Sequence, residues 1–119
     1  VTIHGVVSHT TLENMYNKAH VNMMLTGHDL DGEVEGYGIS VLEGNIFGIP
    51  TIGAKHSGLE ESICPGVNGL LVDPKSPEEI VNALRGISSD YKKYSHRSRQ
   101  YASHNTWAHR IPHYEKSLV

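Results

Sequence analysis

Short apolar runs alternate along the chain with stretches of helical periodicity. The apolar runs are rich in β-branched residues and have the length of strands; they cover residues 1–7, 21–25, 51–54 and 70–72. Because parallel strands must be joined by crossovers, which are usually helical, such alternation favours a parallel sheet. Runs that are apolar almost throughout also fit strands buried on both faces. The pattern predicts an α/β fold in which helices flank a parallel sheet.

Helix signals occupy the intervals between these runs. The first expected helix starts among the capping candidates of residues 8–11 and has apolar side chains at three- and four-residue spacing. The second begins near Gly38 and ends at Gly48 and Pro50, which mark its C-terminus. We expect further helices after Gly58, across residues 91–101, and from Thr106 to Leu118 with a kink at Pro112.

The tetrad Ser76-Pro77-Glu78-Glu79 gives the clearest helix start in the chain. Ser76 is a favoured cap, Pro77 suits the first helical position, and Glu79 stands three residues after the cap. In such a capping box the two polar side chains satisfy each other's backbone N–H groups. We therefore expect a reciprocal capping box at Ser76 and Glu79.

Composition and charge narrow the class of protein. A chain of 119 residues suits one domain, which we place at residues 1–119. Ten Lys and Arg against 13 Asp and Glu give a net charge of −3 without a basic block, so nucleic acid is not an expected partner. The single Cys64 cannot form an internal disulfide, and the sequence has neither a run of about 18 apolar residues nor a signal-peptide layout. We expect a cytoplasmic protein with at most peripheral membrane contact.

The segment from Glu35 to Glu43 carries the chemistry that the sequence suggests. Gly36 and Gly38 lie where a strand and its polar loop give way to a helix, so backbone N–H groups can approach an anion. The partial positive charge of a helix N-terminus would stabilise a phosphate there, including a departing diphosphate. Glu35 lies in the loop before this helix, and Glu43 lies about one turn into the helix. Both carboxylates can accept hydrogen bonds from sugar hydroxyls.

These residues resemble the signature of the family four glycosyltransferases of the GT-B fold, in their C-terminal domain. The family pattern is Glu, seven residues, Glu, usually with Gly-Phe-Gly after the first Glu; this chain has Tyr37 in place of Phe. Further matches are Gly48 and Pro50 of a Gly-x-Pro turn, Gly58 and Glu61 of a Gly-Gly-x-x-Glu segment whose first Gly is Ser57, residues 68–72, and Thr106-Trp107. The resemblance covers nearly the whole chain and implies a Rossmann-like sheet.

The resemblance implies roles for individual residues. Glu43 is expected to bind the ribose diol of a UDP- or GDP-linked sugar, and Glu35 to lie near the hydroxyls of the transferred sugar. The backbone amides of Gly36, Tyr37, Gly38 and Ile39 are expected to hold the distal phosphate or the sugar. Such enzymes transfer sugar with retention to glycan or lipid acceptors and work mainly by positioning and charge stabilisation. No metal or cofactor is implied.

The family has parts without counterparts in this sequence. They are a whole N-terminal domain, two central strands of this sheet, and an upstream Arg and Lys pair for the diphosphate. The four apolar runs would be the third to sixth strands, so the run at residues 1–7 would lack its usual neighbour. We expect a piece of a longer enzyme that binds the donor without transferring sugar by itself. The alternatives are a non-catalytic nucleotide-sugar-binding module that needs a partner chain, and a related epimerase.

Other polar residues add weaker candidates. Lys55 follows the run at residues 51–54, where ligands of α/β sheets gather, and is a candidate phosphate contact. His28, in the polar loop before Glu35, is a candidate donor contact. His109 and His113 have helical ligand spacing but lack the Glu of a zincin motif, so we expect no metal site.

Overall fold

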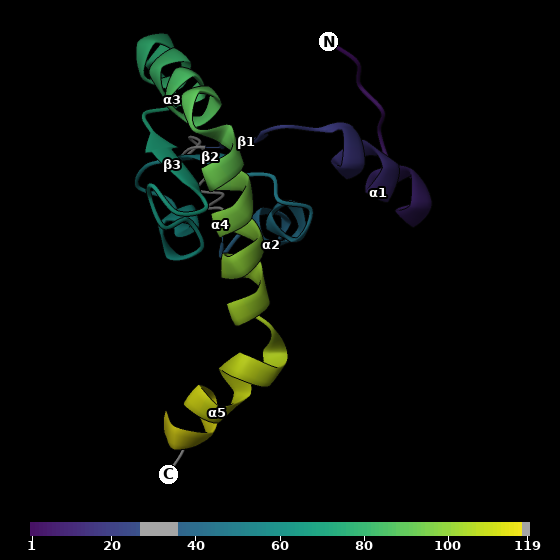
Figure 1. The fold of residues 1–119 in the computed structure, drawn as a ribbon, viewed down its shortest axis with the longest axis vertical. Helices are drawn as coiled ribbons and strands as arrows, with labels where there is room; N and C mark the ends of the chain where they lie inside the picture. Colours follow the sequence, from purple (N-terminus) through teal and green to yellow (C-terminus); the bar gives the residue numbers. More distant parts are fainter. Residues whose placement is uncertain (27–35, 118–119) are drawn as a thin grey trace.

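The computed structural model describes residues 1–26 and 36–117. Within these ranges the core of the fold is a three-stranded parallel sheet in the order β1-β2-β3 (Figure 1). The strands are β1 (Asn22–Met24), β2 (Thr51–Ala54) and β3 (Gly69–Val72). The helices are α1 (His9–Lys18), α2 (Ile39–Ile46), the 3₁₀ helix η1 (Gly58–Glu61), α3 (Pro77–Ser89), α4 (Tyr91–His104) and α5 (Trp107–Ser117). The parallel α/β layer predicted from the apolar pattern is therefore confirmed.

The middle strand β2 organises the sheet. Thr51 pairs with Asn22 of β1 on one side and with Gly69 of β3 on the other, and every residue of β2 is buried. Side chains of successive residues in a strand point to opposite faces. Ile52 accordingly packs under α3, whereas Gly53 faces Leu59 of η1.

Two apolar clusters cover the two faces of the sheet. Ile52 and Val72 pack with Ala83 and Ile87 of α3 on one face. On the other face Val41 of α2 packs with Leu59 and Ile63, with the ends of β1 and β3 beside them. The packing of α2 against this second face fixes the position of its N-terminus.

The predicted strand at residues 1–7 is wrong. The segment forms no strand, and Val1, Ile3 and Val6 are almost fully exposed. An isolated strand is not stable without a hydrogen-bonded neighbour, and the described sheet offers it none. β1 is therefore an edge strand of this sheet, and the expectation of four strands is corrected to three in the described part of the chain.

Helix α1 has the predicted start but stands apart from the sheet. The Ser8 side chain accepts a hydrogen bond of 3.2 Å from the Thr11 N–H, as a cap should. None of its residues is buried, and Figure 1 shows α1 set to one side of the sheet. Its apolar stripe touches the rest of the chain mainly through Tyr16, whose ring stacks on Phe47 with centroids 5.3 Å apart.

The capping box at the start of α3 is only half confirmed. The Ser76 hydroxyl accepts from the Glu79 N–H at 3.3 Å, as predicted. The Glu79 carboxylate does not reach back to Ser76; it accepts instead from the Asp73 N–H at 2.9 Å and from Lys55 Nζ at 2.8 Å. The Ser76 N–H donates to the Asp73 carbonyl at 3.0 Å. Glu79 therefore bonds Lys55 and the Asp73 N–H instead of the Ser76 N–H.

Of the two C-terminal helices, α4 packs on the body of the fold through Tyr91 and Tyr94, and only α5 extends beyond it. In Figure 1 α4 runs along the molecule and α5 turns off its end. Pro112 lies inside α5, where sequence analysis expected it. Among the helices that the structure describes, none is long and apolar enough to cross a membrane.

Candidate functional site

The N-terminus of α2 is shaped by Gly38. This residue has φ 70° and ψ 68°, in the left-handed region that side chains disfavour. A Cβ at this position would lie 2.5 Å from Leu59 Cδ2, so the packing against η1 also requires glycine. No described side chain caps the helix start. Among the described residues, no side chain therefore competes with an anion for the first backbone N–H groups of α2.

This helix start lies over the carboxyl end of β1. The Ser40 hydroxyl donates to Met24 Sδ at 2.9 Å, and Asn22 Nδ2 donates to the Ser40 carbonyl at 3.1 Å. Ligands of doubly wound sheets bind outside the carboxyl ends of the strands. Gly36 and Ile39, two of the predicted donor-binding residues, are exposed at this place.

Glu43 lies one turn into α2 and is half-buried. The Tyr16 hydroxyl lies 3.4 Å from Glu43 Oε2 and donates to it. Burial raises the pKa of Tyr16, and the negative charge of Glu43 raises it further. The carboxylate borders a pocket of about 320 Å³ between α1 and α2, which Glu13 also lines. No spacing in the sequence signals the contact of Tyr16 with Glu43, because the two residues are 27 positions apart.

Glu35 and His28 lie outside the described residues. Their assignments as a positioning residue for the sugar and as a donor contact stay predictions. The described part of the site therefore consists of the Gly36–Ile39 segment, Glu43 and the end of β2.

Lys55 lies at the carboxyl end of β2, as predicted, but its ammonium is paired. Lys55 Nζ bonds Glu79 Oε2 at 2.8 Å, with both side chains about two-fifths exposed. The hydrogen bond from Lys55, and then that from the Asp73 N–H, lower the pKa of Glu79. A phosphate contact by Lys55 would thus compete with this carboxylate.

An arginine from α5 reaches the segment between the two glycines. Arg110 Nη2 donates to the Tyr37 hydroxyl at 2.6 Å, and the guanidinium carbon lies 4.8 Å from the centroid of the Tyr37 ring. The two residues are 73 positions apart, so no spacing in the sequence signals the contact. Beside it, a pocket of about 440 Å³ opens between the start of α2 and α5.

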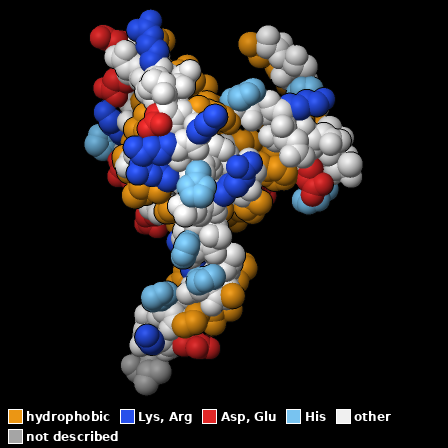
Figure 2. Space-filling view, viewed as in Figure 1, with side chains coloured by type: hydrophobic (Ala, Val, Ile, Leu, Met, Phe, Trp, Pro, Cys, Tyr) orange, Lys and Arg blue, Asp and Glu red, His pale blue; other side chains and the backbone are white. Residues whose placement is uncertain are grey.

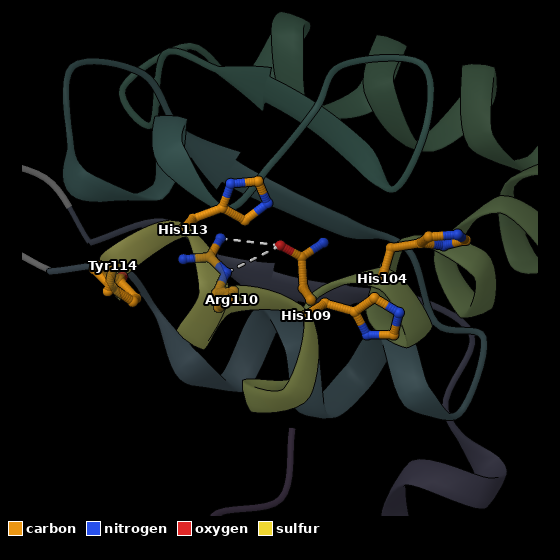
Figure 3. A pocket seen from close by; sticks show the side chains of 6 residues that line it. His104, His109, Arg110, His113 and Tyr114 are labelled. Carbon is orange, nitrogen blue, oxygen red and sulfur yellow. Dashed lines mark hydrogen bonds between the residues drawn. The ribbon is translucent and has the colours of Figure 1, made fainter. Parts of the chain in front are cut away.

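The histidines of α4 and α5 do not assemble a metal site. His104, His109 and His113 line a pocket of about 540 Å³ with Arg110, and Figure 3 shows His113 turned away from the other two rings. The His104 and His109 rings lie 5.9 Å apart between centroids. In residues 1–26 and 36–117 no group of three or more His, Cys, Asp or Glu side chains is placed to hold a metal ion.

Comparisons with known proteins agree with this arrangement. Sucrose synthase of Melioribacter roseus is 39% identical over 56 residues, which are 47% of this chain and 7% of that protein. D-inositol 3-phosphate glycosyltransferase of Geodermatophilus obscurus is 29% identical over 73 residues, 61% of this chain and 16% of that protein. The chain thus matches less than a fifth of the length of either relative.

Among solved structures, sucrose-phosphate synthase from Thermosynechococcus elongatus has the same fold. The two structures superpose with a TM-score of 0.72 at 22% sequence identity. The matched region is 98% of this chain and 30% of the sucrose-phosphate synthase chain. This confirms the Rossmann-like α/β layer of the GT-B type that the sequence predicted. The family model described as "Glycosyl transferases group 1" matches residues 1–105, and the chain therefore belongs to that glycosyltransferase family.

Proposed function

We propose that this chain forms the donor-binding part of a retaining glycosyltransferase that uses a nucleotide sugar. The observation that carries the proposal is the N-terminus of α2, which no described side chain caps, with Glu43 one turn beyond it. Family membership and the position of this helix start over the carboxyl end of β1 support the same reading.

The distal phosphate of the donor binds at the start of α2. The N–H groups of Ile39 and Ser40 precede any intrahelical partner, and the helix dipole adds positive charge at this end. When the glycosidic bond breaks, negative charge grows on the departing diphosphate. Donors that are fixed before the reaction stabilise that charge without reorganisation.

The ribose lies further along α2. Glu43 follows Ile39 by four residues, which corresponds to about 6 Å along a helix axis. An ionised carboxylate accepts hydrogen bonds only, so it fits the two hydroxyls of a ribose diol. Tyr16 steadies one carboxylate oxygen and leaves the other for the ligand. Glu35 completes the site near the transferred sugar, as the family resemblance implies.

The base is uracil or guanine, and the acceptor is a glycan or a lipid met in the cytoplasm or at a membrane surface. We expect these 119 residues alone to bind the donor without transferring sugar. Lys55 is paired with Glu79, and Arg110 donates to Tyr37, so both cations have partners within the chain that compete with a diphosphate. The same pairing favours the second candidate, a non-catalytic nucleotide-sugar-binding module.

Calorimetric titration of the chain with a nucleotide series tests the phosphate position. The titration compares two series of ligands at one salt concentration. The first is UMP, UDP and UDP-glucose, and the second is GMP, GDP and GDP-mannose. A distal phosphate at the α2 N-terminus makes the diphosphate bind about tenfold or more tightly than the monophosphate. Equal affinity for the two in both base series would contradict the proposal. Sugar transfer or hydrolysis by these residues alone would refute the expected inactivity and the module reading.

A further inference from the structure

The Arg110 guanidinium joins three segments of the chain. It donates to the Tyr37 hydroxyl at 2.6 Å, and its Nε and Nη2 donate to Asn105 Oδ1 at 3.3 and 2.9 Å. The dashed lines in Figure 3 mark the two bonds to the amide of Asn105. A planar guanidinium that is bound on two edges has little freedom to rotate. Arg110 is therefore held in one orientation against Tyr37.

The other end of this contact is also anchored. Asn105 ends α4, and its Nδ2 donates to the Tyr101 carbonyl at 2.7 Å. The Tyr101 side chain is half-buried next to Tyr37; burial, and then the neighbouring Tyr37, raise the pKa of Tyr101 to about 12. Tyr37 thus contacts Arg110 from α5 and lies beside Tyr101 from α4.

Tyr37 carries the one side chain of the segment Gly36–Gly38. A Cβ at Gly36 would touch nothing within 4 Å, and Gly38 adopts the left-handed conformation. Glycines on both sides leave the backbone many accessible conformations. The path by which this segment enters α2 consequently depends on where Tyr37 is fixed. A phenylalanine could lie under the guanidinium but could not accept its hydrogen bond.

We propose that Arg110 is a positioning residue for the donor site. By fixing Tyr37 it sets the path of Gly36–Gly38, the backbone that leads into the start of α2. Binding of a nucleotide diphosphate and docking of α5 then stabilise each other, because both favour the same arrangement. The effect on ligand affinity rests on the proposed donor site, whereas the effect on the free chain does not.

The single tryptophan of the chain reports on this contact. Trp107 begins α5, is 75% exposed, and lines the pocket beside Tyr37 and Arg110. Figure 2 shows apolar side chains gathered on α5, where Ile111 and Tyr114 are also exposed. Fluorescence anisotropy of Trp107 therefore measures how firmly α5 is held.

The test compares Arg110→Gln, Arg110→Lys and Tyr37→Phe with the control Arg97→Gln in the full 119-residue chain. The control substitution Arg97→Gln removes the same charge and a 3.0 Å hydrogen bond to the Gly66 carbonyl, away from Gly36–Gly38. Without ligand, Arg110→Gln and Tyr37→Phe are expected to lower Trp107 anisotropy and to speed exchange of the Val41 amide, which donates to the Gly38 carbonyl at 2.9 Å, several-fold. Arg110→Lys restores part of both, and Arg97→Gln changes neither.

Ligand affinity separates the two proposals. UDP and GDP should bind Arg110→Gln about tenfold and Tyr37→Phe several-fold more weakly than the wild type, with Arg97→Gln unchanged. Unchanged exchange and anisotropy in both Arg110→Gln and Tyr37→Phe would overturn the positioning role, even if the wild type binds diphosphates. A wild type that binds no diphosphate, with exchange faster in both variants, would overturn the donor site and leave the positioning of Gly36–Gly38 intact.

Discussion

The side-chain amide of Asn68 donates a hydrogen bond of 2.8 Å to Asn45 Oδ1, and both side chains are fully buried. Asn45 belongs to α2 and donates in turn to the Ile49 carbonyl at 2.9 Å. Asn68 also donates to the Ser62 carbonyl at 2.8 Å and accepts from the Cys64 N–H at 2.7 Å. The pair ties α2, the helix of the proposed donor site, to the turn before β3.

Asn68→Ala should therefore destabilise the chain strongly. Three hydrogen bonds are lost and buried groups are left unsatisfied, each costing roughly 1–3 kcal/mol, so we expect a loss of about 3 kcal/mol or more in the free energy of unfolding. Urea denaturation measures it. Ser98→Ala is the control, because the Ser98 hydroxyl is buried without a hydrogen-bond partner in the described structure. Similar losses in the two variants would contradict this role for Asn68.

Gly38→Ala tests the shape of the helix start. The left-handed backbone costs a side chain about 1–2 kcal/mol, and the contact with Leu59 adds overpacking of about 1–3 kcal/mol. Gly66→Ala is matched, since Gly66 has φ 79° but open space where the Cβ would be. We expect Gly38→Ala to lose clearly more stability than Gly66→Ala in urea. An equal loss would show that packing against Leu59 does not matter.

The raised pKa of Tyr101 predicts a loss of stability at alkaline pH. Its pKa is raised from 10.0 to about 12 in the folded chain, so the neutral phenol is favoured by folding. This contribution is fully present below pH 10 and is lost as the pH rises toward 12. Tyr101→Phe should thus show a smaller fall in unfolding free energy between these values than the wild type. Tyr114→Phe, whose side chain is half exposed, is the control, and an identical slope in all three proteins would oppose the prediction.

The lowered pKa of Glu79 predicts a loss of stability at acidic pH. Lys55 and the Asp73 N–H lower its pKa below the ordinary 4.5, so its contribution is present above pH 4.5 and is lost as the pH falls through the lowered value. Glu79→Gln should be less stable than the wild type at pH 6, and the difference should shrink on acidification. The neighbouring Glu78→Gln controls for charge in the first turn of α3. A difference that stays constant down to pH 3 would rule out the linkage.

The sequence predicts the elements that depend on local signals. Apolar runs of strand length gave β1, β2 and β3 nearly at their observed bounds, and Ser76 with Pro77 gave the start of α3. The α2 helix was predicted from Gly38 to the turn before Pro50, because glycine and proline act on their own backbone.

Features that depend on partners far apart in the chain could not be predicted from the sequence. Residues 1–7 have the composition of a strand, yet a strand needs a neighbour, and the described sheet has none for them. Glu79 meets the spacing rule of a capping box, but Lys55 outcompetes the reciprocal bond. The contact of Arg110 with Tyr37 joins residues 73 positions apart, so only the folded chain reveals it.

The central claim is that Glu43 binds the ribose of the donor, and a comparison of ribo- and deoxyribonucleotides tests it most directly. Calorimetry would give the affinities of UDP, 2′-deoxy-UDP, GDP and 2′-deoxy-GDP for the wild type, Glu43→Ala and Glu13→Ala. Glu13 is the matched control, a carboxylate that lines the same pocket from α1. We predict that the wild type and Glu13→Ala prefer the ribonucleotide by about tenfold, and that Glu43→Ala loses this preference. A preference that survives in Glu43→Ala would contradict the account.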